Sequence, residues 1–283
     1  MAEYSIMLIG GPDSGKTNYL ARLWEGLRSG TGELVLIRAS EIKFLEDMVA
    51  HLLQGEFAPR SSKSIEESRQ EVTVTVAQRG SQSEVDLVVP DVTGELWKIA
   101  VAQSELPVEW MERLEASDGA LLFLRVHSDQ NVQPLDWVTA RTLMQHMGNA
   151  KEAETSVPTQ VFLSELLRFL QLKLRTRPDG SSPRVSVVVT AWDRLGPDQR
   201  AASPFSFIES QFPLFAGRLE NVEGLDVRLF GVSIVGGDLD TDEDFKKTYQ
   251  DGDLAASGYV VIDQNGTVTQ VQDVTLPVKW LLG

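Results

Sequence analysis

The sequence has no cysteine and only three histidines among its 283 residues. Without cysteine the chain can form no disulfide bond, no cysteine-ligated zinc site and no iron–sulfur cluster, and it has no thiol nucleophile. The histidines are His51, His127 and His146, and no two of them have the His-Glu-x-x-His spacing of a zinc protease. These absences exclude the cysteine-based sites and that metalloprotease site.

The chain also lacks long apolar runs and a basic amino terminus. No stretch approaches the roughly 18 consecutive apolar residues of a membrane span. The first residues, Met-Ala-Glu-Tyr-Ser, carry none of the positive charge with which a signal peptide begins. We therefore expect a cytoplasmic protein that makes no contact with a membrane.

Basic residues are in the minority. The chain has 26 lysines and arginines against 41 aspartates and glutamates, which gives a net charge of −15. A body this acidic repels phosphate backbones and anionic lipid surfaces, so we expect no direct binding of nucleic acid. The hydrophobic fraction of 42% is that of a globular protein, and it is enough to form a sizeable core.

Alternating periodicities predict an α/β fold. Short apolar or alternating runs predict strands at 4–9, 71–77, 85–89, 120–126, 185–189 and 227–234, with a further apolar run at 34–37. Helical spacing predicts helices at 18–27, 42–53, 108–114, 162–174 and 205–219, and around 137–147. This order predicts a three-layer P-loop fold, in which helices cover both faces of a mostly parallel sheet with one antiparallel strand.

We find no internal repeat and no linker rich in proline or serine, so we expect a single domain over residues 1–283. It would carry an inserted strand–helix segment at about 32–55 and an acidic insertion at about 236–257. The alternating aspartates 238, 240, 242 and 244 look like a calcium loop. However, Glu243 and Tyr249 stand where that loop needs glycine and glutamate, which favours a solvated acidic loop.

Residues 10–17 read Gly-Gly-Pro-Asp-Ser-Gly-Lys-Thr and match the phosphate-binding pattern GxxxxGK(S/T), which a chain this long contains by chance about once in a hundred cases. A predicted strand precedes the match and a predicted helix follows it. In such a loop the backbone amides and the positive helix end bind phosphates, the lysine reaches the β- and γ-phosphates, and the hydroxyl binds Mg²⁺. The expected binding residues are Gly10, Asp13, Ser14, Gly15, Lys16 and Thr17.

Two further motifs directly follow predicted strands. Asp91-Val92-Thr93-Gly94 follows the strand at 85–89, where Asp91 can hold Mg²⁺ through a water and the Gly94 amide can meet the γ-phosphate. Thr190-Ala191-Trp192-Asp193 follows the strand at 185–189, where the Asp193 carboxylate can accept hydrogen bonds from N1–H and the 2-amino group of guanine. Asp193 can instead be a simple turn cap. Ser233 lies in a loop whose backbone can meet the guanine carbonyl.

The order of these motifs resembles a Ras-like GTPase of the translation-factor-related class. The runs LIGGPDSGKTNYLARLW, GEFAPRS, PDVTGELW and LPVKWLLG more closely resemble the bacterial double-GTPase domain family. The resemblance implies GTP and Mg²⁺ as ligands, a Ras-like fold, and a place in bacterial conflict or anti-phage defence. We also expect a protein partner or effector.

Carried over by position, Lys16 and Thr17 match the phosphate and magnesium residues, and Asp193 matches the base reader. Asp91 and Gly94 match the second switch, and Thr190, at the start of the base motif, is expected to contact the nucleotide. The resemblance places a metal-binding hydroxyl of the first switch at Ser61 or Ser62.

Several residues depart from the family pattern. Thr190-Ala191 replaces Asn-Lys, Glu95 replaces the water-orienting glutamine, and Pro12 removes a backbone donor. Arg60, just before Ser61, is a candidate arginine finger, although a solvated loop arginine is the commoner case. Slow GTP hydrolysis is therefore our first expectation. The alternatives are a GTP-binding interaction module with little turnover, and an ATPase that uses the same loop.

Overall fold

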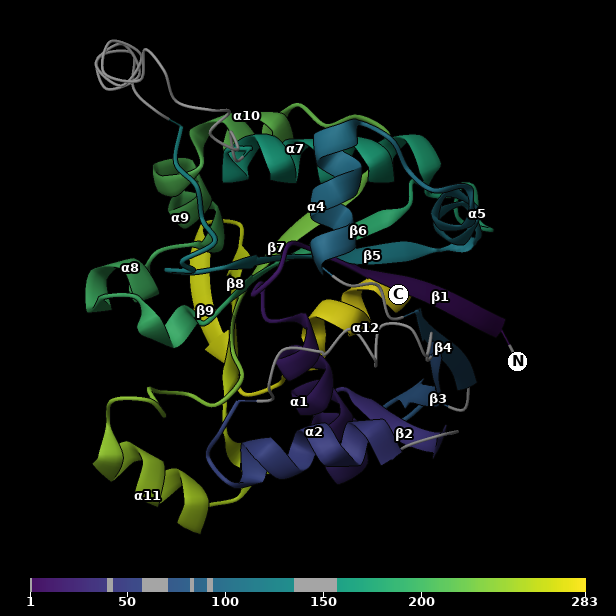
Figure 1. Cartoon of the computed structure of the whole chain (residues 1–283). Coiled ribbons are helices and arrows are strands. Elements are labelled where there is room, and N and C mark those ends of the chain that lie inside the picture. The colour runs from purple at the N-terminus through teal and green to yellow at the C-terminus, as the bar shows by residue number, and fades with distance from the viewer. Residues whose placement is uncertain (1, 40–42, 58–70, 82–83, 91–93, 135–156) are drawn as a thin grey trace, which may run out of the picture.

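The sheet that organises this chain has nine strands in the order β2-β3-β4-β1-β5-β6-β7-β8-β9 (Figure 1). A computed structural model describes residues 2–39, 43–57, 71–81, 84–90, 94–134 and 157–283. In chain order the described strands are β1 (Ala2–Ile9), β2 (Leu34–Ala39), β3 (Glu71–Gln78), β4 (Glu84–Pro90), β5 (Gly119–Arg125), β6 (Arg184–Thr190), β7 (Asp226–Ser233), β8 (Tyr259–Gln264) and β9 (Thr267–Val271).

The central strands are parallel and the edges of the sheet are antiparallel. β1 pairs in parallel with β4 and β5, and the parallel pairing continues to β6 and β7. Among the described strands, β3 and β8 run against the rest, which is one more than the sequence led us to expect. The additional strand, β8, forms a hairpin with β9. Asn265 and Gly266 at its tip both have positive φ (55° and 84°), as a tight hairpin turn requires.

Helices cover both faces of the sheet, as the element order predicted (Figure 1). One face is covered by α1 (Lys16–Ser29), α2 (Lys43–Leu53), α11 (Glu243–Asp251) and α12 (Leu276–Leu282). The other face is covered by α4 (Gly94–Gln103), α5 (Val108–Ala116), α7 (Thr159–Lys173), α9 (Pro204–Gln211) and α10 (Pro213–Glu220). The chain also forms α8 (Pro197–Ala201) and the short 3₁₀ turns η1 (Trp192–Arg194) and η2 (Leu254–Ala256).

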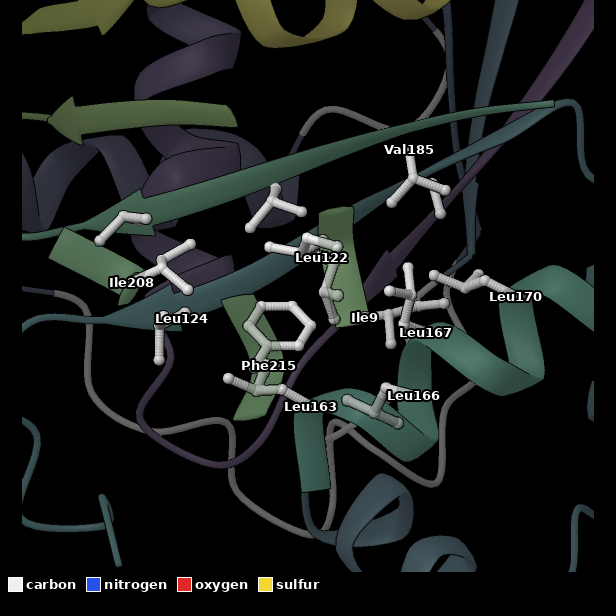
Figure 2. Packing of buried hydrophobic residues seen from close by; sticks show 14 of the residues in the cluster. Ile9, Leu122, Leu124, Leu163, Leu166, Leu167, Leu170, Val185, Ile208 and Phe215 are labelled. Atoms are coloured by element: carbon white, nitrogen blue, oxygen red, sulfur yellow. The ribbon is translucent and has the colours of Figure 1, made fainter. Parts of the chain in front are cut away.

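Each central strand supplies side chains to two cores, because successive residues of a strand point to opposite faces. Ile9 of β1 and Leu122 of β5 pack toward α7, where they meet Leu163 and Leu166 (Figure 2). The neighbouring residues along the same strands, such as Leu8, point to the opposite face and pack toward α1. Burying each such aliphatic side chain contributes about 1.5–3 kcal/mol, so the pattern fixes the register of the parallel strands.

Two helical segments differ from the prediction. The helix expected at 205–219 is two helices, α9 and α10, that meet at Pro213. Proline cannot donate the helical hydrogen bond and its ring clashes with the preceding turn, so α9 ends and α10 begins there. Helix α4 was not predicted, because its apolar residues do not fall on one clear face.

The remaining expectations fall into three groups. The apolar run at 34–37 is the edge strand β2, and the segment 42–53 contains α2. Within the acidic segment, Asp242 caps α11 by accepting a hydrogen bond from the Phe245 amide at 2.9 Å, so part of this segment is helical. The helix expected around 137–147 lies outside the described residues. Of the helices described, none has both the length and the apolar character needed to cross a membrane.

Candidate functional site

Four predicted motifs or residues lie at one edge of the sheet, because five neighbouring parallel strands all end there. The loop of residues 10–17 follows β1, Gly94 follows β4 and Asp193 follows β6, while Ser233 is the last residue of β7. The carboxyl edge of a parallel sheet is where α/β proteins bind ligands. The topology therefore places together residues that are more than 200 positions apart in the chain.

The loop 10–17 ends in a helix whose amino terminus is open to an anion. Helix α1 begins at Lys16, with Gly15 as its N-cap in a left-handed conformation (φ 91°), and its first turn contains no acidic residue. Unpaired backbone amides at a helix start, together with the helix dipole, favour negative charge. This geometry suits a phosphate group, as the sequence motif predicted.

The Lys16 side chain turns back across this loop. Its ammonium group donates hydrogen bonds to the carbonyl oxygens of Gly10 and Gly11 at 2.8 and 2.9 Å, and to the Ser14 hydroxyl at 3.2 Å. These acceptors are uncharged, and an ionised phosphate oxygen is a stronger acceptor than any of them. The lysine is thus positioned at the mouth of the loop, where a phosphate would bind.

Thr190 holds the loop from the neighbouring strand β6. Its buried hydroxyl donates to the Ser14 carbonyl at 2.9 Å. A Cβ on Gly15 would lie only 2.8 Å from that hydroxyl oxygen, so Gly15 is required both for its positive φ and for this close approach. The sequence suggested that Thr190 contacts the nucleotide. In the structure its hydroxyl contacts the loop backbone, so Thr190 positions the loop, and its contact with a nucleotide stays a prediction.

Asp13 is held from behind the loop by two residues that the sequence analysis missed. Its carboxylate pairs with the Arg125 guanidinium at 2.5 Å and accepts a hydrogen bond from the Ser128 hydroxyl at 2.8 Å. The backbone of Asp13 is left-handed (φ 59°). The clamp neutralises an acid that would otherwise repel a phosphate. The position of Arg125 in the sequence could have indicated this role, because Arg125 ends the central strand β5 at the ligand-binding edge of the sheet.

Gly94 brings the start of α4 against the same loop. A Cβ on Gly94 would overlap the backbone of Gly11 and Pro12, so no other residue fits at this approach without movement. The following Glu95 is exposed in the first turn of α4. Asp91 of this motif lies outside the described residues, as do Arg60, Ser61 and Ser62.

Asp193 and Ser233 meet between the ends of β6 and β7. Asp193 is half-buried in the turn η1, and burial raises the pKa of its carboxyl group above the ordinary value. A hydrogen bond with the Ser233 hydroxyl opposes that rise in pKa. Ser233 is fully buried, and its oxygen also accepts the Gly236 amide at 2.8 Å. The two residues predicted to read a base are therefore adjacent.

A buried arginine that no motif predicted fixes the Ser233 loop. Arg22 of α1 is 2% exposed, and it donates to the Ile234 carbonyl at 3.2 Å and to the Ser257 carbonyl. From the other side, a Cβ on Gly258 would lie 2.7 Å from the carbonyl oxygens of Ser233 and Ile234. The helix that follows the phosphate loop thus also orients the loop beside Asp193.

Comparison with known proteins agrees with this arrangement of motifs. The family model described as Double-GTPase 1 matches residues 7–281. A search of curated proteins gave no match.

Two solved structures are similar to parts of this chain. The structure of Methanosarcina barkeri Roco2 RocCORdC bound to GDP has 12% identity and a TM-score of 0.31, and the match covers 89% of this chain and 48% of that one. The S. cerevisiae Ski7 GTPase-like domain bound to GTP has 8% identity and a TM-score of 0.40, with 82% and 43% covered. The chain spans less than half the length of either structure. The family model, in contrast, covers nearly the whole sequence, and the chain belongs to the Double-GTPase 1 family.

Proposed function

We propose that this chain binds GTP together with Mg²⁺ at the carboxyl edge of its sheet, hydrolyses it slowly and acts as a nucleotide-dependent switch. Membership of a GTPase family supports guanine-nucleotide binding. The observation that carries the proposal is the convergence of the loop 10–17, held by Thr190 and Arg125, with the adjacent pair Asp193 and Ser233. One half of this site suits phosphates and the other half suits a base.

The phosphate half fits the polyphosphate of a nucleotide. The start of α1 supplies backbone amides, and Lys16 supplies a cation that now rests on neutral oxygens. Thr17 comes directly after Lys16, and its hydroxyl is a candidate ligand for Mg²⁺. The other expected ligands, Asp91 and Ser61, lie outside the described residues. When bound, the metal ion would neutralise charge on the β- and γ-phosphates.

The base half favours guanine over adenine. Guanine presents N1–H and a 2-amino group, and a carboxylate can accept hydrogen bonds from both. Adenine offers neither donor in that geometry. Asp193 can accept them only when ionised, and Ser233 helps to stabilise the ionised form. An ATPase would leave this half-buried carboxylate without a partner on the base.

Hydrolysis is expected to be slow. Glu95 carries a negative charge where a neutral amide would orient the attacking water, and its charge opposes an approaching γ-phosphate. Pro12 lacks the amide proton that the loop would otherwise offer. These two residues also favour the second candidate, a GTP-binding interaction module with little turnover. The arginine-finger role of Arg60 stays a prediction, and a single-turnover assay of Arg60→Ala tests it: a rate reduced at least tenfold, with GTP affinity intact, supports that role.

Nucleotide titrations of three variants test the binding proposal. Lys16→Ala should weaken GTP binding by about 100-fold, because a charge-assisted contact to phosphate is lost, and should leave the melting temperature nearly unchanged. Asp193→Asn should weaken the binding of GTP. It should also shift the nucleotide preference toward xanthosine triphosphate, whose 2-oxygen accepts a hydrogen bond from the asparagine amide. Lys247→Ala, an exposed lysine on α11, is the control.

The titrations also distinguish the alternatives. Wild-type affinity of Lys16→Ala for GTP would disprove the phosphate-loop assignment. An unchanged guanine-to-adenine ratio in Asp193→Asn would leave Asp193 as a turn cap, and tighter binding of ATP than of GTP would favour an ATPase. The partner protein, the cytoplasmic location and the role in anti-phage defence are proposals that rest on the family resemblance.

A further inference from the structure

A cavity of about 160 Å³ lies behind the phosphate loop, on the face of the sheet covered by α4 and α7. Gly11 and Pro12 form one wall, and the apolar side chains of Leu124, Val132 and Phe162 contribute to the others. An engineered apolar cavity of about 150 Å³ binds benzene. The volume here therefore suits one ring or one branched aliphatic group.

This cavity is distinct from the nucleotide cradle. Its lining includes none of Lys16, Thr17, Asp193 or Ser233. The residues that the cavity shares with the cradle belong to the loop, such as Gly11 and Ser14. A ligand in this cavity would therefore lie next to a bound nucleotide without occupying the same space.

The charge of the lining differs from that of the whole molecule. The described residues that line the cavity include two cations, Lys98 of α4 and Arg125 of β5, and no acid. The whole chain has 41 acidic and 26 basic residues. Asn131 and Ser128 add polar groups on the same side as Arg125. Apolar walls with a cationic rim match a small molecule that has an apolar body and one negative charge.

We propose that this cavity binds a small organic carboxylate, with a ring or branched chain against Leu124 and Phe162 and its anionic group at Lys98 and Arg125. Phenylacetate has this chemistry and a suitable size. With about ten non-hydrogen atoms it should bind with a Kd of about 1 mM. The charge of the carboxylate provides the specificity, because apolar walls alone would bind phenylacetate and its neutral amide equally.

Binding at this site affects the phosphate loop through Arg125. The same guanidinium clamps Asp13, so a ligand carboxylate that shares Arg125 weakens its hold on the loop. The ligand and the nucleotide then oppose one another, and by linkage each lowers the affinity of the other by the same factor. This coupling rests on the proposed nucleotide site, whereas the cavity itself does not.

An NMR titration of the nucleotide-free chain with phenylacetate and phenylacetamide tests the cavity. Phenylacetate should bind at least about tenfold more tightly than the amide, as expected for one charge-assisted hydrogen bond. Lys98→Met keeps the length of the side chain but removes its charge, and should weaken phenylacetate several-fold. Val132→Trp should fill the cavity and abolish binding. Lys247→Met on α11, across the sheet, is the matched control and should change nothing.

The outcomes test separately whether the cavity binds a carboxylate and whether that binding is coupled to the nucleotide. Equal affinity for acid and amide, no binding of phenylacetate at 10 times the expected Kd, or unchanged binding in Lys98→Met would each overturn the cavity proposal. Repeating the titration with saturating GDP should raise the Kd for phenylacetate, and an unchanged Kd would overturn the coupling. If GDP itself does not bind, the proposed function fails, and the nucleotide-free titration still decides whether the cavity binds the carboxylate.

Discussion

Asp13 occupies a backbone conformation that glycine adopts with less strain. A left-handed residue with a side chain costs about 1–2 kcal/mol relative to an ordinary conformation. A hydrogen bond to a charged group contributes about 1.5–3 kcal/mol, so the Arg125 clamp is large enough to offset that strain. The clamp makes Asp13 a contact between the loop and β5.

Asp193 carries the clearest pH dependence of the site. Its pKa is raised in the folded protein, mainly by burial, so the folded state binds its proton more tightly than the unfolded state. The ionised carboxyl group therefore lowers the stability of the nucleotide-free protein at neutral pH. This effect disappears as the pH falls below the ordinary aspartate pKa of about 3.9.

Asp193→Asn should therefore raise the melting temperature of the nucleotide-free protein at pH 7 and have little effect near pH 3. Thermal melts of wild type and variant across this range measure the difference. Asp198→Asn, at an exposed position in α8, serves as the control. A variant that is less stable than wild type at pH 7 would show that the hydrogen bond with Ser233 outweighs the burial of the charge.

At the scale of elements, the phosphate loop depends on the strands beside it. Thr190 of β6 and the clamp from β5 contact the loop from below, and Gly94 brings α4 against its side. The motif predicted the loop and the helix α1. It gave no indication of these supports, because they come from other strands and become neighbours only when the parallel sheet forms.

Gly15→Ala should disrupt this arrangement more than an equally strained glycine elsewhere. Both Gly15 (φ 91°) and Gly180 (φ 81°) are left-handed, but a Cβ on Gly180 meets no atom within 4 Å. Gly180→Ala should therefore lose only about 1 kcal/mol of stability, whereas Gly15→Ala should lose more and should bind GTP at least tenfold more weakly. Urea unfolding and nucleotide titration measure the two effects. Equal losses in both variants would mean that the contact with Thr190 is unimportant.

At the scale of the whole molecule, one continuous sheet joins the two halves of the site. Strand β5 lies at the centre, and the phosphate loop and the base loop extend from strands on either side of it. Arg22 adds a connection across the helical layer, from α1 to the loop after β7. Ligand binding at this edge should therefore stabilise the fold as a unit.

Saturation with GDP should raise the melting temperature. A ligand at 100 times its Kd adds about 2.7 kcal/mol to the stability of the state that it binds, which corresponds to roughly 5 °C for a domain of this size. Thermal melts with GDP, and with ADP at the same concentration, measure the effect. Lys16→Ala, with a Kd about 100-fold higher, should shift by less than about 1 °C with either nucleotide. A shift with ADP as large as that with GDP would contradict guanine selectivity.

The elements that depend on local chemistry could be read directly from the amino-acid sequence. The phosphate loop is a contiguous motif between a strand and a helix, and the β-branched run at 185–189 allowed little other than a buried strand. The parallel order of the sheet followed from the alternation of elements, which is why the sequence also placed Asp193 near the phosphate loop. Pro213 was present in the sequence, but the long apolar pattern at 205–219 led us to predict a single helix there.

Only the tertiary structure decided which side chains support those motifs. Arg125, Ser128 and Arg22 act through contacts across more than 100 positions of sequence, and no local pattern encodes such pairings. The contact of the Thr190 hydroxyl with the loop backbone depends on the register between β5, β6 and β1. The cavity behind the loop likewise exists because α4 and α7 leave space beside the end of β5. Packing between distant elements set these features, and packing is not a property of any one segment.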